Sequence, residues 1–596
     1  ANYVTNCVFY RSITFSSVYT FIVQAIHKKQ SVSKFGIKNN KGVFTLVMQK
    51  LDLIKLYSNK RALVVDEFPD MRASIRRMLR SFGVETVDVA NDGGDAMARC
   101  RENQYDIIIC DYSLGKGKNG QQILEELRFT QSLNHQAIYI LVTAEVTRSM
   151  VFGALEYKPD DYLIKPFNPL LLQARLDNLM LEKQFFSNVY EALDESDYEA
   201  AAEHAEVLVN RDRRYRVAAQ KLQGQALLQS AQFDKAHKLY HDVMERRRQE
   251  WACIGCARAL IGLQKWTSAI HVLSELIDHG TESLQVFDCL AEAELALGRN
   301  GVAQAILERA TVSSPYGILR QINLAEVASA NNDYLAAEKA YRRVIKLGVN
   351  SCHDSHEHSL GLVRCLLDKE KQQISGNSDT FKECYTVCHR IKKKYGNEAQ
   401  VILQADLIEA KTLAQQGEID MAIEHAQKLF AKYREEENIL PGLGLDMAAA
   451  LLAIDKPNQG REVLEDLAER FAEDNLLLAK IDAMADQPIS TKAKENASKI
   501  NAEGKVLFET DNFDEAVAHF RMAVNHYPNN VELKLNLLLA IMQCVNTTNA
   551  GAAESLEMVD EAASLIASLE SLPSVHKAYQ RYQSLASEMQ QLQDAA

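Results

Sequence analysis

A recurring four-residue segment that ends in alanine constrains this chain most. The segments FDKA, WTSA, NGVA and YLAA place Ala236, Ala269, Ala303 and Ala337 at intervals of 33, 34 and 34 residues. A period of this length is typical of arrays in which each repeat is a pair of helices that buries its apolar face against its neighbours. Most of the chain from residue 185 to residue 590 is therefore expected to be an all-α solenoid.

The composition excludes several classes of protein. Only 26 Gly and 10 Pro occur in 596 residues, which favours helix over loop, and the net charge of −13 makes DNA or RNA an unexpected partner. No apolar run after Met48 is long enough to cross a membrane, so no membrane partner is expected. Eleven cysteines without the spacing of a disulfide framework suit a reducing compartment, and we expect a cytoplasmic protein.

The first 57 residues differ from the rest. Residues 1–47 contain no Asp or Glu, and Lys28 and Lys29 follow their apolar run instead of preceding it. A secretory signal would carry its positive charges before the run. We interpret Met48 as the natural start and residues 1–57 as an N-terminal extension outside the fold.

Residues 58–180 alternate short apolar runs with amphipathic stretches. The segments RALVVD, VETVDVA, YDIIICD, AIYILVT and DYLI predict five strands, and PDMRASIRRMLRSF predicts a helix opened by Pro69. This alternation indicates an α/β domain with a doubly wound five-stranded parallel sheet, in which ligands bind beyond the carboxyl ends of the strands. The residues that fall at those ends are Asp66, Asp111, Thr143 and Lys165.

These strand-end residues predict a phosphoryl site. Asp66, Glu67 and Asp111 would repel one another unless a hard divalent cation such as Mg²⁺ lay between them. Thr143 would add a hydroxyl group and Lys165 a compact positive charge, which suits an anionic phosphoryl group. Asp111 is the candidate nucleophile, because carboxylates can form aspartyl-phosphate intermediates.

The segments VVDE, IICDY, LVTAE and YLIKPF carry these residues at characteristic intervals, 45 positions from Asp66 to Asp111 and 22 from Thr143 to Lys165. They closely resemble the receiver domain of two-component response regulators. The resemblance implies that Asp111 accepts phosphate from a histidine kinase or a histidine phosphotransfer protein. It also implies a Mg²⁺ site formed by Asp66, Glu67, Asp111 and the backbone carbonyl of Ser113.

The same resemblance implies a switch. Lys165 would pair with the phosphoryl group, the bond before Pro166 would be cis, Thr143 would turn toward the phosphate, and Tyr162 would follow it inward. No separate enzyme activity is expected beyond weak autodephosphorylation, tuned by Ser113 and Glu145.

Two segments depart from the receiver pattern. LGKGKNG replaces the usual Met-Pro step after the acceptor, and Lys158–Pro159 replaces a common Gly-Ala step. The second change leaves the geometry of the output face open. A receiver that takes up no phosphate is the alternative interpretation.

The helical region resembles tetratricopeptide repeats, most clearly in NAEGKVLFETDNFDEAVAHFRMAVNHYP at residues 501–528. We expect repeats at 181–487 and a last repeat with capping helices at 488–596, about nine helical pairs in all. Small residues such as Gly255 would let the helices of a pair approach closely. No Gly or Pro lies between Pro169 and Gly224, which predicts that the last receiver helix runs unbroken into the repeats.

Three further clusters have two interpretations each. Cys253 and Cys256 have the spacing of a redox or zinc pair, but we expect packing residues inside a helix. Basic segments at 211–216 and 245–249 are expected to be solvated helix faces, with a weak contact to RNA or an acidic protein as the alternative. A loop without metal, or a transition-metal site completed by Cys365 or Cys388, would explain the cluster of Cys352, His353, His356 and His358.

Together these features predict a phosphorelay response regulator that accepts a phosphoryl group on Asp111. Its repeats would signal by binding a protein whose identity the sequence does not give. The alternatives are a constitutive scaffold or phosphate-sink adaptor, and an adaptor associated with nucleic acid.

Overall fold

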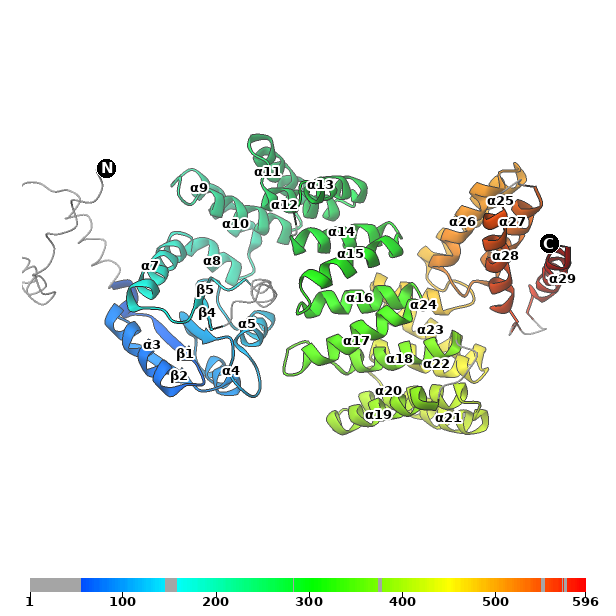
Figure 1. Cartoon of the computed structure of the whole chain (residues 1–596), viewed down its shortest axis with the longest axis horizontal. Helices are drawn as coiled ribbons and strands as arrows, with labels where there is room; N and C mark the ends of the chain where they lie inside the picture. The colour runs from blue at the N-terminus through cyan, green and yellow to red at the C-terminus, as the bar shows by residue number, and fades with distance from the viewer. Residues whose placement is uncertain are drawn as a thin grey trace, which may run out of the picture. The chain divides into compact units, whose positions relative to one another are not determined.

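The computed structural model describes residues 55–144, 158–281, 283–372, 378–547, 552–570, 572 and 576–595. These residues form two compact units, the first running to residue 195 and the second from residue 196 onward (Figure 1). The predictions for residues 1–47 and for Glu145 lie outside the described residues.

A five-stranded parallel sheet forms the centre of the first unit. Its strands lie in the order β2-β1-β3-β4-β5, and every neighbouring pair is parallel. The predicted doubly wound sheet is therefore confirmed. The strand bounds are β1 Arg61–Val65, β2 Thr86–Ala90, β3 Ile107–Asp111, β4 Ile138–Thr143 and β5 Asp161–Ile164.

Helices cover both faces of this sheet, which explains why its central strands β3 and β4 are buried along their whole length and are mostly apolar (Figure 1). Helices α3 (Pro69–Phe82) and α7 (Pro169–Phe185) pack on one face, and α4 (Gly93–Glu102) and α5 (Gly120–Phe129) lie on the other. The core includes Tyr57, which is 1% exposed and whose hydroxyl donates to Asp177 over 2.8 Å. The boundary drawn after residue 57 therefore leaves out a core residue.

The predicted unbroken linker helix is wrong. Helix α7 ends at Phe185, the short α8 (Ser187–Asp194) follows, and α9 (Tyr198–Val209) begins after a turn in which Ser196 has φ 61°. The Asp197 side chain accepts a hydrogen bond from the Ala200 amide and so caps α9. Capping residues can end one helix and start the next without Gly or Pro, so the absence of those two residues does not by itself predict one continuous helix.

Helix α8 is held to the sheet of the first unit. The backbone amide of His135, which precedes β4, donates to Asp194 over 2.8 Å, and Lys183 donates to the His135 carbonyl over 2.6 Å. Phe186, between α7 and α8, is fully buried and packs edge-on against Phe185. The segment up to Glu195 therefore belongs to the body of the first unit.

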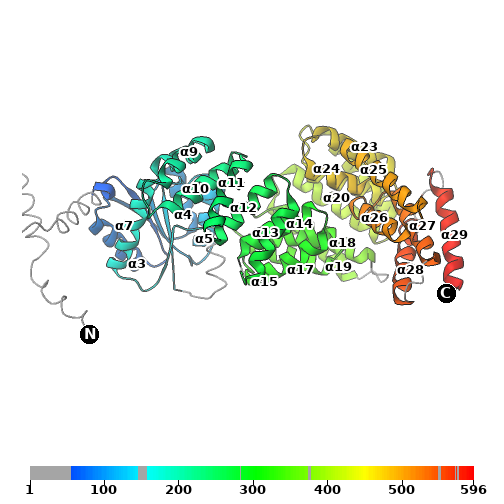
Figure 2. The ribbon, with the colours of Figure 1, turned by 90° about the horizontal axis from the view of Figure 1, so that it is seen from above.

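The second unit is a succession of helices in its described residues (Figure 2). After α9 they are α10 Arg216–Gln229, α11 Phe233–Arg246, α12 Glu250–Gly262, α13 Trp266–Asp278, α14 Leu284–Ala296, α15 Asn300–Ser313, α16 Ile318–Ala330, α17 Tyr334–Gly348, α18 His356–Gln372, α19 Ser378–Lys394, α20 Ala399–Gln415, α21 Ile419–Glu435, α22 Pro441–Ala453, α23 Pro457–Arg470, α24 Asn475–Met484, α25 Thr491–Glu509, α26 Phe513–His526, α27 Val531–Thr547, α28 Ala552–Ala567 and α29 Tyr579–Ala595. The expected helical array is confirmed.

The repeat period has a structural cause. Each alanine of the period lies on the second helix of a pair and is 0% exposed, at Ala236, Ala269, Ala303 and Ala337. The turn before each of these helices contains one residue in the left-handed region, with φ between 55° and 72°, at Ala231, Gln264, Gly298 and Asn332. Each repeat therefore contains the same pair of features, a turn with one left-handed residue and a buried alanine on the helix that follows it.

Tyr240 on α11 shows why small residues matter in this array. A Cβ atom added to Gly224 or to Gly255 would lie 2.3 Å from atoms of the Tyr240 side chain. Gly224 is on α10, the partner of α11, whereas Gly255 is on α12. The prediction of close approach is confirmed, although Gly255 serves a contact between pairs and not within one.

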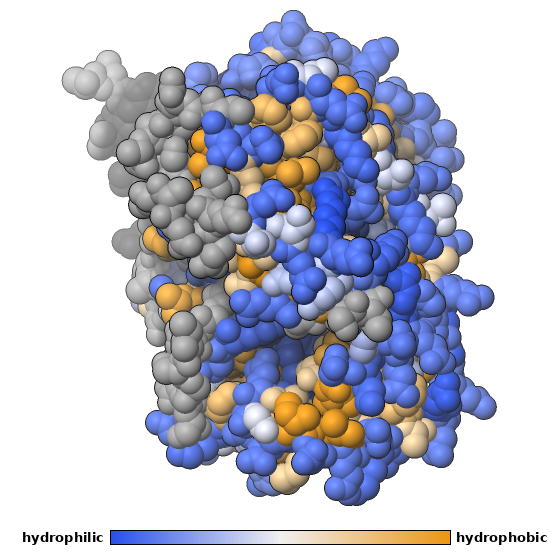
Figure 3. Space-filling model, turned by 90° about the vertical axis from the view of Figure 1, so that its right-hand side faces the viewer, coloured by the Kyte–Doolittle hydropathy of each residue, from blue (hydrophilic) through white to orange (hydrophobic). Residues whose placement is uncertain are grey.

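The cysteines at 253 and 256 are buried, unpaired packing residues on α12, as expected for the packing interpretation. Hydrophilic side chains cover most of the face seen in Figure 3, with two groups of hydrophobic side chains between them. No helix among the described residues is both long enough and apolar enough to span a membrane.

Candidate functional site

The strand ends bring the predicted residues to one edge of the sheet. Asp111 is the last residue of β3 and Thr143 the last of β4, while Asp66 and Lys165 directly follow β1 and β5. The strand register aligns these ends, because Asp111 lies opposite Val142. The sequence therefore located the four residues correctly.

Lys165 joins two carboxylates at this edge. Its Nζ donates to Asp66 Oδ2 over 2.8 Å and to Asp111 Oδ2 over 2.7 Å. Asp66 is 1% exposed and Asp111 6% exposed. One ammonium group thus serves two nearly buried negative charges, and a backbone hydrogen bond from Phe68 to Asp66 Oδ1 supports the arrangement.

Burial dominates the electrostatics of Asp111. It raises the pKa of the carboxyl group above its ordinary value, and the negative charge of Asp66 raises it further, whereas hydrogen bonds from Lys165 and from the Ser113 backbone lower it. Burial would lower the pKa of Lys165, but its bonds to Asp111 and Asp66 raise it overall. The lysine is therefore protonated, and the Asp111 charge is only partly compensated.

The remaining predicted metal ligands lie on exposed loops beside this edge. Glu67 and Ser113 are exposed, and the carboxylate of Glu67 faces the loop after β3, where its Oε2 lies 3.0 Å from the position of a Cβ on Gly115. Carboxylate and carbonyl oxygens are the donors that Mg²⁺ prefers. The incomplete compensation of Asp111 and this donor set fit a hard divalent cation.

Gly120 was not predicted as a site residue, although it fixes the backbone of the acceptor. A Cβ at this position would lie 2.2 Å from the backbone oxygen of Asp111. The Gly120 amide also donates to the Tyr112 carbonyl over 3.0 Å. Glycine is therefore required where α5 begins, and the segment LGKGKNG already contained this signal.

Arg72 was also missed. From α3 its Nη1 donates to the backbone oxygens of Asp66 and Glu67 over 2.6 and 3.0 Å. It therefore holds the loop that carries both acids. Nothing in the sequence separated it from the other arginines of this helix.

The predicted switch residues occupy neighbouring strands. Thr143 is 3% exposed at the end of β4, and Tyr162 is partly exposed on β5. The Lys165–Pro166 bond is cis, as the resemblance implied. Lys158, in the atypical Lys-Pro step, has φ 48°, and its carbonyl accepts a hydrogen bond from Arg128 over 2.5 Å.

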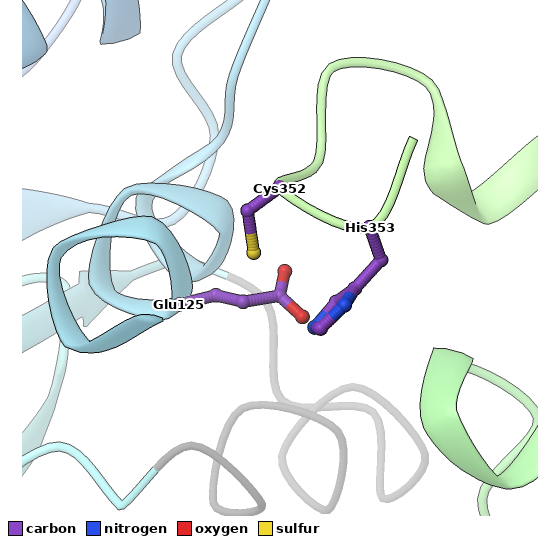
Figure 4. Close-up of side chains that lie close together, drawn as sticks. All are labelled: Glu125, Cys352 and His353. Carbon is purple, nitrogen blue, oxygen red and sulfur yellow. The ribbon is translucent and has the colours of Figure 1, made fainter. Parts of the chain in front are cut away.

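The residues of the Cys and His cluster lie on the loop before α18 and on the first turn of that helix. Cys352 and His353 lie on the loop that precedes α18, and Glu125 lies on α5 (Figure 4). The Nε2 atom of His358 is hydrogen-bonded to the backbone carbonyl of His353 over 3.1 Å. The ring of His356 packs edge-on against the ring of Tyr395. Among the described residues of the second unit, no three His, Cys or carboxylate side chains bring their donor atoms together.

Part of this chain is similar to known proteins. Residues 62–177 match the family model of the response regulator receiver domain. Chemotaxis protein CheY-3 of Vibrio cholerae and chemotaxis protein CheY of Pseudomonas aeruginosa are each 28% identical, over 124 and 119 residues. The matches cover 21% and 20% of this chain and 94% of each relative. The structure of the response regulator protein TrrA from Thermotoga maritima, in complex with Mg²⁺ and BeF, is 28% identical over 20% of this chain and 98% of its own, with a TM-score of 0.18.

Proposed function

We propose that this chain, which carries a response regulator receiver domain at residues 62–177, is a phosphorelay response regulator whose acceptor is Asp111. The observation that carries the proposal is the pairing of Lys165 with both Asp66 and Asp111 at the carboxyl edge of the sheet. This arrangement holds a carboxylate that is negative, confined and only partly neutralised. Such a group can attack a phosphoryl group delivered to it.

The transfer is a displacement at phosphorus. An oxygen of Asp111 forms a bond to phosphorus while the bond from phosphorus to the donor nitrogen of a phosphohistidine breaks, and that nitrogen keeps the electron pair. The ammonium group of Lys165 then donates its hydrogen bond to a phosphoryl oxygen in place of Asp111 Oδ2. Its charge remains at the site throughout, because its pKa is raised.

Asp66, Glu67, Asp111 and the carbonyl of Ser113 are the residues that would hold Mg²⁺. When bound, the cation neutralises charge on the phosphoryl oxygens as they approach the acids. The chain's own part is to orient these oxygens. Asp66 is held by the Phe68 amide, and Arg72 fixes the loop behind it.

Thr143 and Tyr162 are the proposed reporters of phosphorylation. Thr143 ends the strand next to that of Asp111, and Tyr162 lies on the strand beyond it. A hydroxyl at the first position suits a bond to a new phosphoryl oxygen. Inward movement of Tyr162 would then change the surface beside β5.

The helical repeats are the proposed output, acting through a protein partner. Arrays of this kind offer long surfaces but no catalytic pocket of their own. Their described helices expose large hydrophobic side chains, including Val312, Leu335 and Leu476, at 83%, 70% and 81%. Such groups suit a protein ligand better than a nucleic acid.

Incubation of the full chain with a small phosphodonor and Mg²⁺ tests the acceptor. Wild type should gain one acid-labile phosphate, and Asp111→Asn should gain none. Glu102→Gln, which removes an exposed acid at the end of α4, is the matched control and should behave as wild type. Failure of the wild type to take up phosphate would refute the proposal.

A second measurement separates signalling from a phosphate sink. A protein captured by the full chain should bind with different affinity before and after phosphorylation of wild type, and with one unchanged affinity for Asp111→Asn. Equal affinity in all states would favour the sink or scaffold. If the full chain captures a nucleic acid in place of a protein, the affinity for it should fall steeply as the salt concentration rises.

A further inference from the structure

One face of α3 carries four arginines. Arg72, Arg76 and Arg80 are four positions apart, so they follow one another along the helix at intervals of roughly 6 Å, and Arg77 lies beside them. Asp70 is the one acidic residue of this helix. The segment therefore has a local charge of +3, four arginines less one aspartate, in a chain whose net charge is −13.

The positive charge on this face is not neutralised by neighbouring acids. Among the described residues, the side chains of Arg76, Arg77 and Arg80 make no hydrogen bond or ion pair. The Nε of Arg76 is buried without a hydrogen-bond partner. A buried donor without a partner costs free energy, so a ligand that supplies an acceptor would be stabilised there.

These arginines line a groove. It has a volume of about 670 Å³ and is lined by α3 and by Val89 of β2, with Asp70 its one acidic lining residue. Grooves of this size hold small molecules. Its apolar lining residues are Pro69, Ala73 and Val89, and none of them is an aromatic residue or Met, which are enriched at the centre of protein interfaces.

The chemistry of the lining selects the ligand. Guanidinium groups present several N–H donors in a planar fork that matches phosphate oxygens, and they keep their charge at all ordinary pH values. Arg72 already donates to the backbone of Asp66 and Glu67, so its end of the groove lies beside the loop of the acids. A ligand with two or more phosphoryl groups would engage Arg76, Arg77 and Arg80 together.

We propose that the groove between α3 and Val89 binds a small anion that carries at least two phosphoryl groups. The site is distinct from Asp111, and the proposal does not depend on phosphorylation of that residue. Binding at Arg72 would place the ligand next to the loop that holds Asp66.

Titration calorimetry of the full chain with inorganic pyrophosphate tests the proposal. Pyrophosphate chelates divalent cations, so the titration is done at low ionic strength without them. We expect pyrophosphate to bind at least tenfold more tightly than orthophosphate. Arg76→Gln and Arg80→Gln should each weaken it by roughly tenfold, as expected for loss of a charged hydrogen bond.

Arg213→Gln is the charge-matched control, because it removes an exposed arginine outside α3 and should leave binding unchanged. Thermal unfolding of each variant shows whether it is folded. Absence of pyrophosphate binding, or equal binding by the α3 variants and wild type, would overturn the proposal. Binding of a glutamate oligomer or of a single-stranded oligonucleotide in place of pyrophosphate would also overturn it, in favour of a macromolecular contact.

Discussion

Two carboxylates, Asp111 in the receiver and Glu357 in the repeats, show opposite responses to their surroundings. At both sites burial raises the pKa. Lys165 fails to offset this effect at Asp111, whose pKa stays above its ordinary value, whereas Arg364 and Gln404 more than offset it at Glu357, whose pKa is lowered. The receiver thus keeps its acid partly uncompensated, and the repeats compensate theirs fully.

The difference follows from the partners. Arg364 on α18 donates to Asp446 of α22 over 2.8 and 2.5 Å and to Glu357 over 3.1 Å. Gln404 of α20 donates to Glu357 and to Asp446 over 2.7 and 2.8 Å. Both cations serve two carboxylates, but a guanidinium holds its five donors in a fixed fork, whereas the three donors of the Lys165 ammonium can rotate toward a third group. A buried carboxylate whose charge is fully compensated stabilises the fold. One whose charge is only partly compensated, as at Asp111, can still react with an incoming group.

The largest effect is expected from removing Arg364. Arg364→Met leaves the carboxylates of Glu357 and Asp446 without their cation, which should lower the unfolding free energy of the repeats by about 2 to 4 kcal/mol, allowing for partial exposure. Chemical unfolding followed by circular dichroism measures the change. Lys428→Met removes the cation of an exposed pair with Glu424 and should change the unfolding free energy far less than Arg364→Met does. A similar loss in both variants would contradict the comparison.

Two glycines sharpen the contrast in packing. Gly255→Ala should destabilise the repeats by about 1 to 3 kcal/mol, because its methyl group meets the Tyr240 ring, and should leave phosphate uptake unchanged. Gly120→Ala should instead abolish most phosphate uptake, because its methyl group meets the Asp111 carbonyl. Thermal unfolding and a phosphorylation assay are applied to both variants. Gly301→Ala is the control, since the added methyl group would lie within 4 Å of no atom outside its own chain neighbours and the backbone of its own helix.

Replacement of Asp by the isosteric Asn should change the unfolding free energy in opposite directions in the two regions. Asp446→Asn removes an acceptor from Arg364 and should destabilise the chain by about 1 to 2 kcal/mol. Asp111→Asn relieves the repulsion from Asp66 and should stabilise it by less than about 1 kcal/mol in the absence of divalent cations. Unfolding midpoints measured without Mg²⁺ compare the two. Destabilisation by both changes would remove the distinction between compensated and uncompensated acids.

The smallest effect concerns the repeat turns. Gln264 has φ 58°, a conformation that glycine adopts without the steric cost of a Cβ. Gln264→Gly should therefore stabilise the repeats by about 0.5 to 1 kcal/mol in thermal unfolding. Gly298→Ala, at the equivalent turn with φ 72°, should do the reverse, and its methyl group would also meet the His526 ring.

The sequence predicted the parts of the molecule that depend on local pattern. The five strands, the helix opened by Pro69 and the strand-end positions of Asp66, Asp111, Thr143 and Lys165 all follow from apolar runs and known spacing. The 33- to 34-residue spacing of Ala236, Ala269, Ala303 and Ala337 likewise predicted the repeats, and all four alanines are buried.

Other features depend on contacts that no local pattern reveals. Arg364 and Asp446 are 82 residues apart, and nothing near either one indicates a partner. The end of α7 was missed because burial of Phe186 and capping by Asp197 outweighed the helical propensity of the segment. Arg72 and Gly120 support the acids through backbone contacts, which side-chain chemistry does not disclose.

The attachment of α8 decides how the receiver can be isolated. A fragment cut at Met180, where the sequence pattern ends, would lose Phe186 from its core and the bonds that join His135 to Asp194 and Lys183. A fragment that continues to Glu195 keeps all of them. Protein prepared with the longer boundary should resist proteolysis and remain monodisperse during purification, whereas the shorter one should aggregate through its newly bared apolar edge.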